Sequence, residues 1–421
     1  MEKSIASALK DAHKFEQQAD RKTAQQAANL YEKAVNKYHD ALNLGASGEQ
    51  SLEARMGKGD CYQKWAEALL HKMVSLTNDD LTIEAERRAQ KRAEALYQSA
   101  VDEYKQTDTG SCQMDFNASV NCGNTLASWA ELCEPREACR HLQEAAMHYR
   151  TVLQLDSEDT EVWQNLSDVL VQLGESLCET DRQSEGEECF REAFESYTQS
   201  CGLCDSRKGD DLPGLLENWG LGLVTASRCI EDVYQREEYA NDAIKRLKDA
   251  ATFHRGRPDP FCGLGDAYTA RSLLEPLERS LETLSLAVEE GYGEALKLDR
   301  SCAEAVLGNA EVHMMMGKRL RELGDEEGAV YRFTKCADVY GHALCSPQAL
   351  GGFKERSTVQ YNYGCACILA GRLRIAEAVF RRLIHKHGCT GKDLMSDSDF
   401  ESVKHEPWFQ QLLLDAGEMT D

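Results

Sequence analysis

The segment 361-YNYGCACILAGRLRIAEAVFRRL-383 contains no acid–base pair, no metal-binding cluster and no phosphate-binding loop, yet its small residues are regularly placed. Gly364 is followed seven residues later by Gly371, and then come Ala376 and Phe380. Glycine at 371 separates two stretches of helical periodicity and is a common breaker between helices. The spacing therefore predicts one helix, a tight turn at Gly371, and a second helix.

The same pattern recurs along the chain, so internal repetition has to be considered before any single motif. Asn121-Cys-Gly123 precedes Ala145 and Tyr149, and Leu307-Gly308 precedes Ala329 and Phe333. In most copies a first helix carries one small residue, and a second helix carries alanine and an aromatic residue; in the copy at Gly220 the second helix has Leu247 in place of the aromatic residue. The small residues of the first helices are Gly59, Gly123, Ser167, Gly220, Gly265, Gly308 and Gly364.

On these residues the chain resembles the tetratricopeptide-repeat (TPR) proteins, whose helix–turn–helix unit has a period of ~34 residues. The resemblance implies an all-α fold, a right-handed TPR-like α-solenoid of about seven or eight repeats. It also implies that Gly364 and Ala376 lie where helices A and B of one repeat touch, with Phe380 filling the gap above them. We expect three regions: an N-terminal helix pair at 1–46, an extended repeat array at 47–388 and a C-terminal capping segment at 389–421.

The repeats are longer than the family pattern. Gly364 and Ala376 are 12 residues apart, as in a standard repeat, but the corresponding distances in four other repeats are 19 to 23 residues. The additional residues, such as those around 172–186, keep a helical pattern, whereas an inserted loop would be richer in Gly, Pro and Ser. We therefore expect longer hairpins, not inserted loops.

The composition restricts the partners and the compartment. A net charge of −24 argues against nucleic acid or an anionic membrane as a partner. The chain has no apolar run long enough to span a bilayer and no secretory leader. Its 17 scattered cysteines are typical of a reducing compartment. These features predict a cytoplasmic protein, or one from the plastid or mitochondrial interior after removal of a presequence.

The sequence contains no recognisable catalytic motif, cofactor-binding motif or metal-binding motif, and it therefore predicts a protein that is not an enzyme, with no catalytic residues, no cofactor and no metal site. Cys201 and Cys204 form the only CxxC pair. A zinc site would need further ligands at ordinary spacing, and none follows. We interpret the pair as part of a connector after a helix B, with a redox role as the alternative.

The remaining candidate is the surface lined by the A helices, which the resemblance makes the concave, peptide-binding face. We number the positions within each repeat so that the small residue of helix A is position 8. Asparagine then recurs two residues before it, at position 6, and Asp or Asn recurs directly after it, at position 9. Amide groups can bond a peptide backbone without reading its sequence, and the carboxylates favour a basic ligand. The same residues are also the family's usual choice, so a generic repeat remains the alternative. The predicted peptide-binding residues are Asn121, Asn124, Asn165, Asp168, Asn218, Asp266, Asn309 and Asn362.

The sequence thus predicts a non-enzymatic scaffold or adaptor that binds an extended peptide or a partner protein on its concave helix-A face. The alternative is a structural or assembly-factor subunit of a larger complex, with contacts through the elongated hairpin edges.

Overall fold

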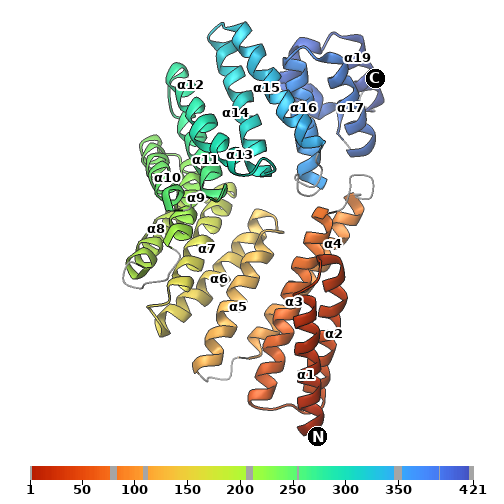
Figure 1. Cartoon of the computed structure of the whole chain (residues 1–421), viewed down its shortest axis with the longest axis vertical. Coiled ribbons are helices and arrows are strands. Elements are labelled where there is room, and N and C mark those ends of the chain that lie inside the picture. The colour runs from red at the N-terminus through yellow and green to blue at the C-terminus, as the bar shows by residue number, and fades with distance from the viewer. Residues whose placement is uncertain are drawn as a thin grey trace. The chain divides into compact units, whose positions relative to one another are not determined.

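The computed structural model describes residues 2–75, 83–107, 112–204, 212–253, 256–345, 353–387 and 389–416. Every regular element in these ranges is helical. The helices divide between two compact units, of which the first holds α1 to α9 and the second α10 to α19 (Figure 1). None of the helices described is both long enough and apolar enough to cross a membrane.

In the first unit α1 packs against α2, α2 packs against α3, and each helix from α5 to α8 packs against the next along the chain; each odd-numbered helix also contacts the next odd-numbered one. The odd-numbered helices are the A helices and form one continuous layer, with the B helices behind them. The helices of this unit are α1 (Glu2–Ala19), α2 (Ala24–Asn43), α3 (Glu49–Ser75), α4 (Ile83–Lys105), α5 (Cys112–Ala130), α6 (Pro135–Leu155), α7 (Thr160–Glu179), α8 (Gln183–Cys204) and α9 (Leu212–Cys229).

In the second unit the A helices are α11, α14 and α16, and one B helix is kinked. Its parts are α12, the π-helical segment η1 and α13, which follow one another without a break. The elements of this unit are α10 (Val233–Phe253), α11 (Asp259–Ser272), α12 (Leu277–Leu286), η1 (Ala287–Tyr292), α13 (Gly293–Leu298), α14 (Ala303–Glu322), α15 (Glu326–Leu344), α16 (Phe353–Leu369), α17 (Leu373–His387), α18 (Gly391–Ser396), the 3-10 helix η3 (Ser398–Val403) and α19 (Pro407–Asp415).

The predicted all-α, TPR-like solenoid fold is confirmed by these consecutive helix pairs. The prediction of elongated hairpins is confirmed as well: α7 and α8 have 20 and 22 residues, whereas α16 and α17 have 17 and 15. The sequence between Ser167 and Gly186 therefore extends the two helices and not the turn between them.

Local sequence explains where the helices begin and end. The Asp159 carboxylate accepts the backbone N–H of Val162 at 3.0 Å and caps α7, because an N-cap side chain can satisfy an amide that has no partner within the helix. Gly371 has φ +74° between α16 and α17, a backbone conformation that glycine adopts without strain. The turn predicted at Gly371 is thus confirmed.

Packing within the last repeat explains its small residue. A Cβ on Gly364 would lie 2.5 Å from the ring of Phe380, so a larger side chain would displace the ring. Phe380 is fully buried in a cluster that also contains Phe400 and Phe409 from the C-terminal segment. The C-terminal elements thereby cover apolar surface that the last repeat would otherwise expose.

One local prediction is wrong. Cys201 and Cys204 lie in the last turn of α8, which ends at Cys204, and not in a connector after the helix. Cys204 is buried and Cys201 half-buried. Helix B extends further than the sequence suggested because Ser200 and Cys204 continue its buried face.

Candidate binding face

The predicted peptide-binding residues all lie on A helices, but they are divided between the two units. Asn121 and Asn124 are on α5, Asn165 and Asp168 on α7, and Asn218 on α9. The second unit holds the remaining three, Asp266 on α11, Asn309 on α14 and Asn362 on α16. We call the row of position-6 and position-9 side chains within each unit the helix-A face.

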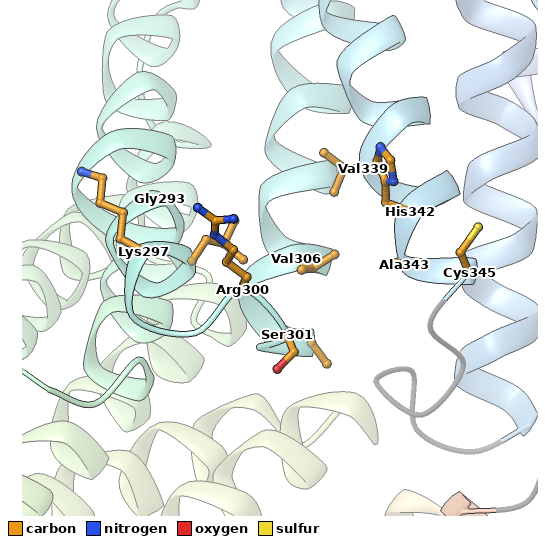
Figure 2. A pocket seen from close by; sticks show the side chains of 11 residues that line it. Gly293, Lys297, Arg300, Ser301, Val306, Val339, His342, Ala343 and Cys345 are labelled. Atoms are coloured by element: carbon orange, nitrogen blue, oxygen red, sulfur yellow. The ribbon is translucent and has the colours of Figure 1, made fainter.

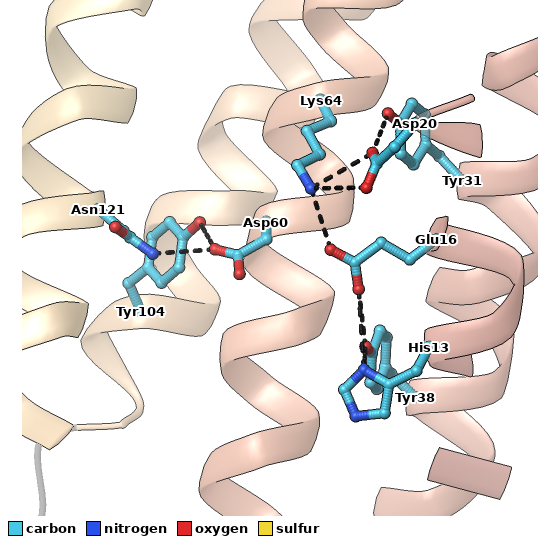
Figure 3. Close-up of polar contacts among 9 residues, drawn as sticks. All are labelled: His13, Glu16, Asp20, Tyr31, Tyr38, Asp60, Lys64, Tyr104 and Asn121. Carbon is cyan, nitrogen blue, oxygen red and sulfur yellow. Dashed lines mark hydrogen bonds and ion pairs between the residues drawn. The ribbon is translucent and has the colours of Figure 1, made fainter. Parts of the chain in front are cut away.

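In the first unit these residues take part in a repeated hydrogen-bonded arrangement, which we call a rung. Tyr104 of α4 donates its hydroxyl proton to Asp60 of α3 at 2.6 Å, and Asn121 of α5 donates to the same carboxylate at 3.0 Å (Figure 3). A rung therefore joins the B helix, the A helix of the same repeat and the A helix of the next repeat.

The next repeats form the same rung with small variations. Tyr149 donates to the Asn124 carbonyl at 2.6 Å, and Asn165 donates to that oxygen at 3.4 Å. Tyr197 donates to the Asp168 carboxylate, to which Asn218 also donates, at 3.1 Å. Position 9 is thus the shared acceptor, and position 6 of the following A helix is a donor.

A charged version of the rung occurs at the N-terminal end. The Tyr38 hydroxyl donates to Glu16 at 3.0 Å, and the Lys64 ammonium lies 3.1 Å from the other oxygen of that carboxylate (Figure 3). Lys64 also approaches Asp20, which accepts the Tyr31 hydroxyl at 2.8 Å. Lys64 is therefore the second donor to the shared carboxylate, as asparagine is in the later rungs.

Glycine at position 8 makes room for the tyrosine ring in the Asp60 and Asn124 rungs, whereas the Asp168 rung has Ser167 at this position. A Cβ on Gly59 would lie 2.6 Å from the Tyr104 ring, and one on Gly123 would lie 2.7 Å from the Tyr149 ring. Such distances are well inside van der Waals contact. The small residue noted in the sequence is therefore needed so that the tyrosine can pass over helix A and reach position 9.

The second unit keeps only parts of this arrangement. Tyr292 donates to Asp266 at 2.9 Å, and Tyr340 is hydrogen-bonded to Asn362. Val306, a position-6 residue, cannot donate. Asn309 is only 8% exposed, so its side chain is largely inaccessible to a peptide.

Burial controls the charge of the position-9 acids. Burial raises the pKa of Asp168 to about 6, although the hydrogen bonds from Tyr197 and Asn218 act in the opposite direction. Burial likewise raises the pKa of Asp60, against the hydrogen bond from Tyr104. Because a buried carboxylate loses hydration, its charged form becomes less favourable. These acids attract a basic ligand less strongly at mildly acidic pH than at neutral pH.

The asparagines of the helix-A face in the first unit are not simply exposed to solvent. Asn121, Asn165 and Asn218 are half-buried, and each uses one side-chain N–H to bond the preceding repeat. Across the described part of the chain, their side-chain carbonyls accept no hydrogen bond. The rungs therefore hold three amides in a fixed orientation, each with one carbonyl acceptor left.

The tyrosines of the rungs were not among the predicted site residues, although the sequence carries a signal for them. In α4, α6 and α8 the tyrosine follows a fully buried alanine by four residues, as in Ala145 and Tyr149 or Ala193 and Tyr197. That spacing places both side chains on one face of helix B. The repeated A-x3-Y motif could have identified the donor of each rung.

A separate groove of about 720 Å³ lies within the second unit, between α13, α14 and α15. Its walls are apolar at Leu296, Val306 and Val339, and Lys297, Arg300 and His342 stand around it (Figure 2). Lys297 pairs with Glu294 at 2.5 Å. No described carboxylate lies within ion-pair distance of Arg300, so this guanidinium is available to a ligand.

Comparison with known proteins gives limited similarity. No protein-family model matches the sequence, and no curated protein matches it. Among solved structures, the chain is similar to a signal-transduction ATPase with a tetratricopeptide repeat sensor, PH0952 from Pyrococcus horikoshii, at 12% identity and a TM-score of 0.40, covering 92% of this chain and 54% of that one. It is also similar to YrrB, described as a TPR protein with an unusual peptide-binding site, at 17% identity and a TM-score of 0.32, covering 60% of this chain and 95% of that one. A human IFIT1 dimer with PPP-AAAA matches at 14% identity and a TM-score of 0.32, covering 94% of this chain and 86% of that one.

Proposed function

We propose that this chain is a non-enzymatic scaffold that binds an extended peptide or a segment of a partner protein across the helix-A face of its first unit. The observation that carries the proposal is the row of oriented amides at Asn121, Asn165 and Asn218. Each amide is held by a rung and keeps a carbonyl that can accept a backbone N–H from a bound chain. Nothing in this geometry requires a particular ligand side chain.

The chemistry of the ligand follows from the acids beside these amides. Asp60 and Asp168 lie in the same rungs, and the chain as a whole carries a net charge of −24. Lysine or arginine in the ligand would be attracted to this surface, whereas nucleic acid would be repelled by most of it. In the second unit, Asp266 and Asn362 would belong to the separate helix-A face of that unit, and the buried Asn309 would support that face without contacting a ligand.

Peptide selection with matched variants tests the proposal. Peptides selected from a displayed library on the intact protein would be measured against wild type and against Asn121→Ala, Asn165→Ala, Asn218→Ala combined. We expect the triple variant to weaken binding at least tenfold. The control combines Asn36→Ala and Asn241→Ala, two exposed asparagines on B helices, and should change affinity less than about threefold.

Stability has to be followed in the same experiment, because the triple variant also removes three hydrogen bonds between repeats, each worth ~1 kcal/mol. Circular dichroism identifies a temperature at which all variants are folded, and affinity is compared there. Failure to enrich any peptide, or equal binding by the folded triple variant, would exclude the helix-A face as the binding site.

The alternative, an assembly subunit that contacts partners through its hairpin edges, is favoured by exposed apolar residues in the second unit. Tyr234 and Val233, at the start of α10, are 85% and 55% exposed. Exposed apolar side chains that cluster often mark protein contacts. Replacing both by serine would abolish association with a large partner but leave peptide binding unchanged if this alternative holds.

The groove beside α13 adds a second feature to this alternative. Its free Arg300 and apolar walls suit an acidic segment with an adjacent apolar side chain. Arg300→Glu would then release such a partner.

The state of the cysteines supports the cytoplasm as the proposed compartment. No disulfide bond joins the cysteines whose side chains are described, a state that reducing compartments maintain.

A further inference from the structure

The turn between α5 and α6 brings together three side chains of different chemistry. Cys133 lies in the turn, and Glu137 and His141 follow at intervals of four residues on α6. The thiol sulfur, a carboxylate oxygen and a ring nitrogen of His141 all lie within 4.8 Å of one another. Because residues four apart share one face of a helix, α6 presents Glu137 and His141 to the same point.

The imidazole of His141 has a buried nitrogen atom that makes no hydrogen bond. This atom, Nε2, has no partner among the residues that the structure describes. The ring stacks on Trp129, with centroids 4.0 Å apart and planes 25° apart, so its orientation is fixed. A buried ring nitrogen that is held in a fixed orientation and has no hydrogen-bond partner can bind a metal ion.

The surroundings of the thiol are acidic. The negative charges of Glu137 and Glu94 act on the Cys133 sulfur, and the Arg140 guanidinium acts in the opposite sense. Arg140 pairs with Glu137 at 3.2 Å, but both side chains are more than half exposed, so this pair is weak. A cation placed between the thiol and the carboxylates would be stabilised by the same charges that disfavour a free thiolate.

We propose that Cys133, Glu137 and His141 form a binding site for a divalent transition-metal ion, for which Zn²⁺ is the best match. Zinc accepts sulfur, nitrogen and oxygen ligands together at bond lengths of ~2.0–2.3 Å, whereas Mg²⁺ and Ca²⁺ prefer oxygen alone. Water supplies the fourth ligand from the exposed side of Glu137. On binding, the Cys133 thiol forms a sulfur–metal bond and releases its proton to water.

A second cluster shows that closely spaced ligand atoms are not by themselves enough to indicate a metal site. Cys365, Asp397 and Asp399 also place their ligand atoms within 4.8 Å of one another. There, however, the Lys318 ammonium lies 2.8 Å from Asp399, and the Tyr361 hydroxyl donates to Asp397 at 3.0 Å. This cluster already contains its cation and its donor. It therefore serves as an internal control that should not bind metal.

Cobalt titration of the intact, reduced and chelator-treated protein tests the proposal, because Co²⁺ replaces Zn²⁺ and gives a near-ultraviolet charge-transfer band only with a bound thiolate. We expect one equivalent of Co²⁺ to produce this band and Zn²⁺ to abolish it. Cys133→Ser should remove the band, and His141→Ala and Glu137→Gln should each weaken Co²⁺ binding at least tenfold. Cys365→Ser should bind as wild type does.

Two results would overturn the proposal. One is the absence of a charge-transfer band at micromolar Co²⁺. The other is a band that Cys133→Ser leaves unchanged, which would assign the metal to other thiols of this cysteine-rich chain. Should His141→Ala fail to fold, His141→Gln preserves a polar side chain over Trp129, and its loss of Co²⁺ affinity answers the same question.

Discussion

The α7–α8 hairpin of the first unit and the α11–α13 hairpin of the second contain the same hydrogen bond, from a tyrosine of helix B to an aspartate of helix A. The geometry of helix B differs between the two hairpins. In α8, Tyr197 follows the buried Ala193 by four residues, and its hydroxyl reaches Asp168. In the second hairpin Tyr292 follows the buried Ala287 by five residues, and its hydroxyl reaches Asp266. The extra residue lies in η1, the π-helical segment at Ala287–Tyr292.

The comparison shows that the hydrogen bond between tyrosine and aspartate is kept when the second helix has one more residue. The regular α-helical geometry is lost at that place. A π turn accommodates one additional residue within a helix, and here the helix also bends at Gly291. The accommodation depends on Gly291, which has φ −95° and ψ −105° and whose Cβ would lie 2.5 Å from the Cα of Gly265. The kinked helix B therefore lies backbone to backbone against helix A.

The largest effect is expected when this contact is broken by Gly291→Ala. Because the obstructing atoms belong to the backbone of α11, the methyl group cannot be accommodated by a side-chain rotation. We expect a loss of at least ~3 kcal/mol in the free energy of unfolding of the second unit, measured by urea denaturation.

The matched control for this variant is Gly202→Ala in α8, where nothing lies within 4 Å of the added Cβ. It should be neutral or stabilising by up to ~1 kcal/mol, since alanine favours the helix. Equal losses for the two variants would mean that helix packing at Gly291 is looser than the structure shows.

A smaller effect is expected from Tyr197→Phe, which removes the hydroxyl from a buried carboxylate. The loss should be ~2–3 kcal/mol, because a hydrogen bond to a charged group is worth more than one to a neutral group. Tyr149→Phe, whose acceptor is the neutral Asn124, should lose only ~1 kcal/mol. Thermal unfolding of both variants provides the measurement, and the reverse order would contradict a charged Asp168.

The charge of Asp168 also predicts a pH dependence. Its folded pKa of about 6 lies above the ordinary value of 3.8, so the folded state binds a proton that the unfolded state has released. Its contribution to stability is therefore full below pH 4 and is lost as the pH rises through 6. Asp168→Asn, which copies Asn124 of the preceding rung, should remove this loss.

The comparison of wild type with Asp168→Asn isolates this one group from the other acids. The variant should gain on the order of 2 kcal/mol relative to wild type between pH 4 and pH 7, as measured by urea denaturation at each pH. A difference that stays constant over this range would show that Asp168 titrates normally.

The smallest effect is expected from deleting the exposed Glu289, which restores the four-residue spacing between Ala287 and the tyrosine. If the π turn only absorbs an insertion, stability should change by less than ~1 kcal/mol. A larger loss would show that the π turn is required for its own contacts, such as the 2.6 Å hydrogen bond from Tyr268 to Glu290.

How much of the site was predictable can be judged from Asn121 and Asn165. Their positions on the A helices follow from the spacing to Gly123 and Ser167, but their hydrogen bonds to Asp60 and Asn124 do not. The small residues of successive repeats are 43 to 64 residues apart, and this variable spacing leaves the register between neighbouring A helices undetermined. Conversely, the A-x3-Y motif was present in the sequence and would have identified the tyrosine donors.

The sequence by itself determined the helical hairpins, their small contact residues and their unusual length, because helix periodicity and glycine turns act over a few neighbouring residues. The tertiary structure decided which partners the polar groups have. Only the packed chain shows that Asn218 bonds Asp168, that η1 brings Gly291 against Gly265, and that a turn places Cys133 beside His141. These contacts depend on how neighbouring helices stack, and burial then determines how strongly each polar group requires its partner.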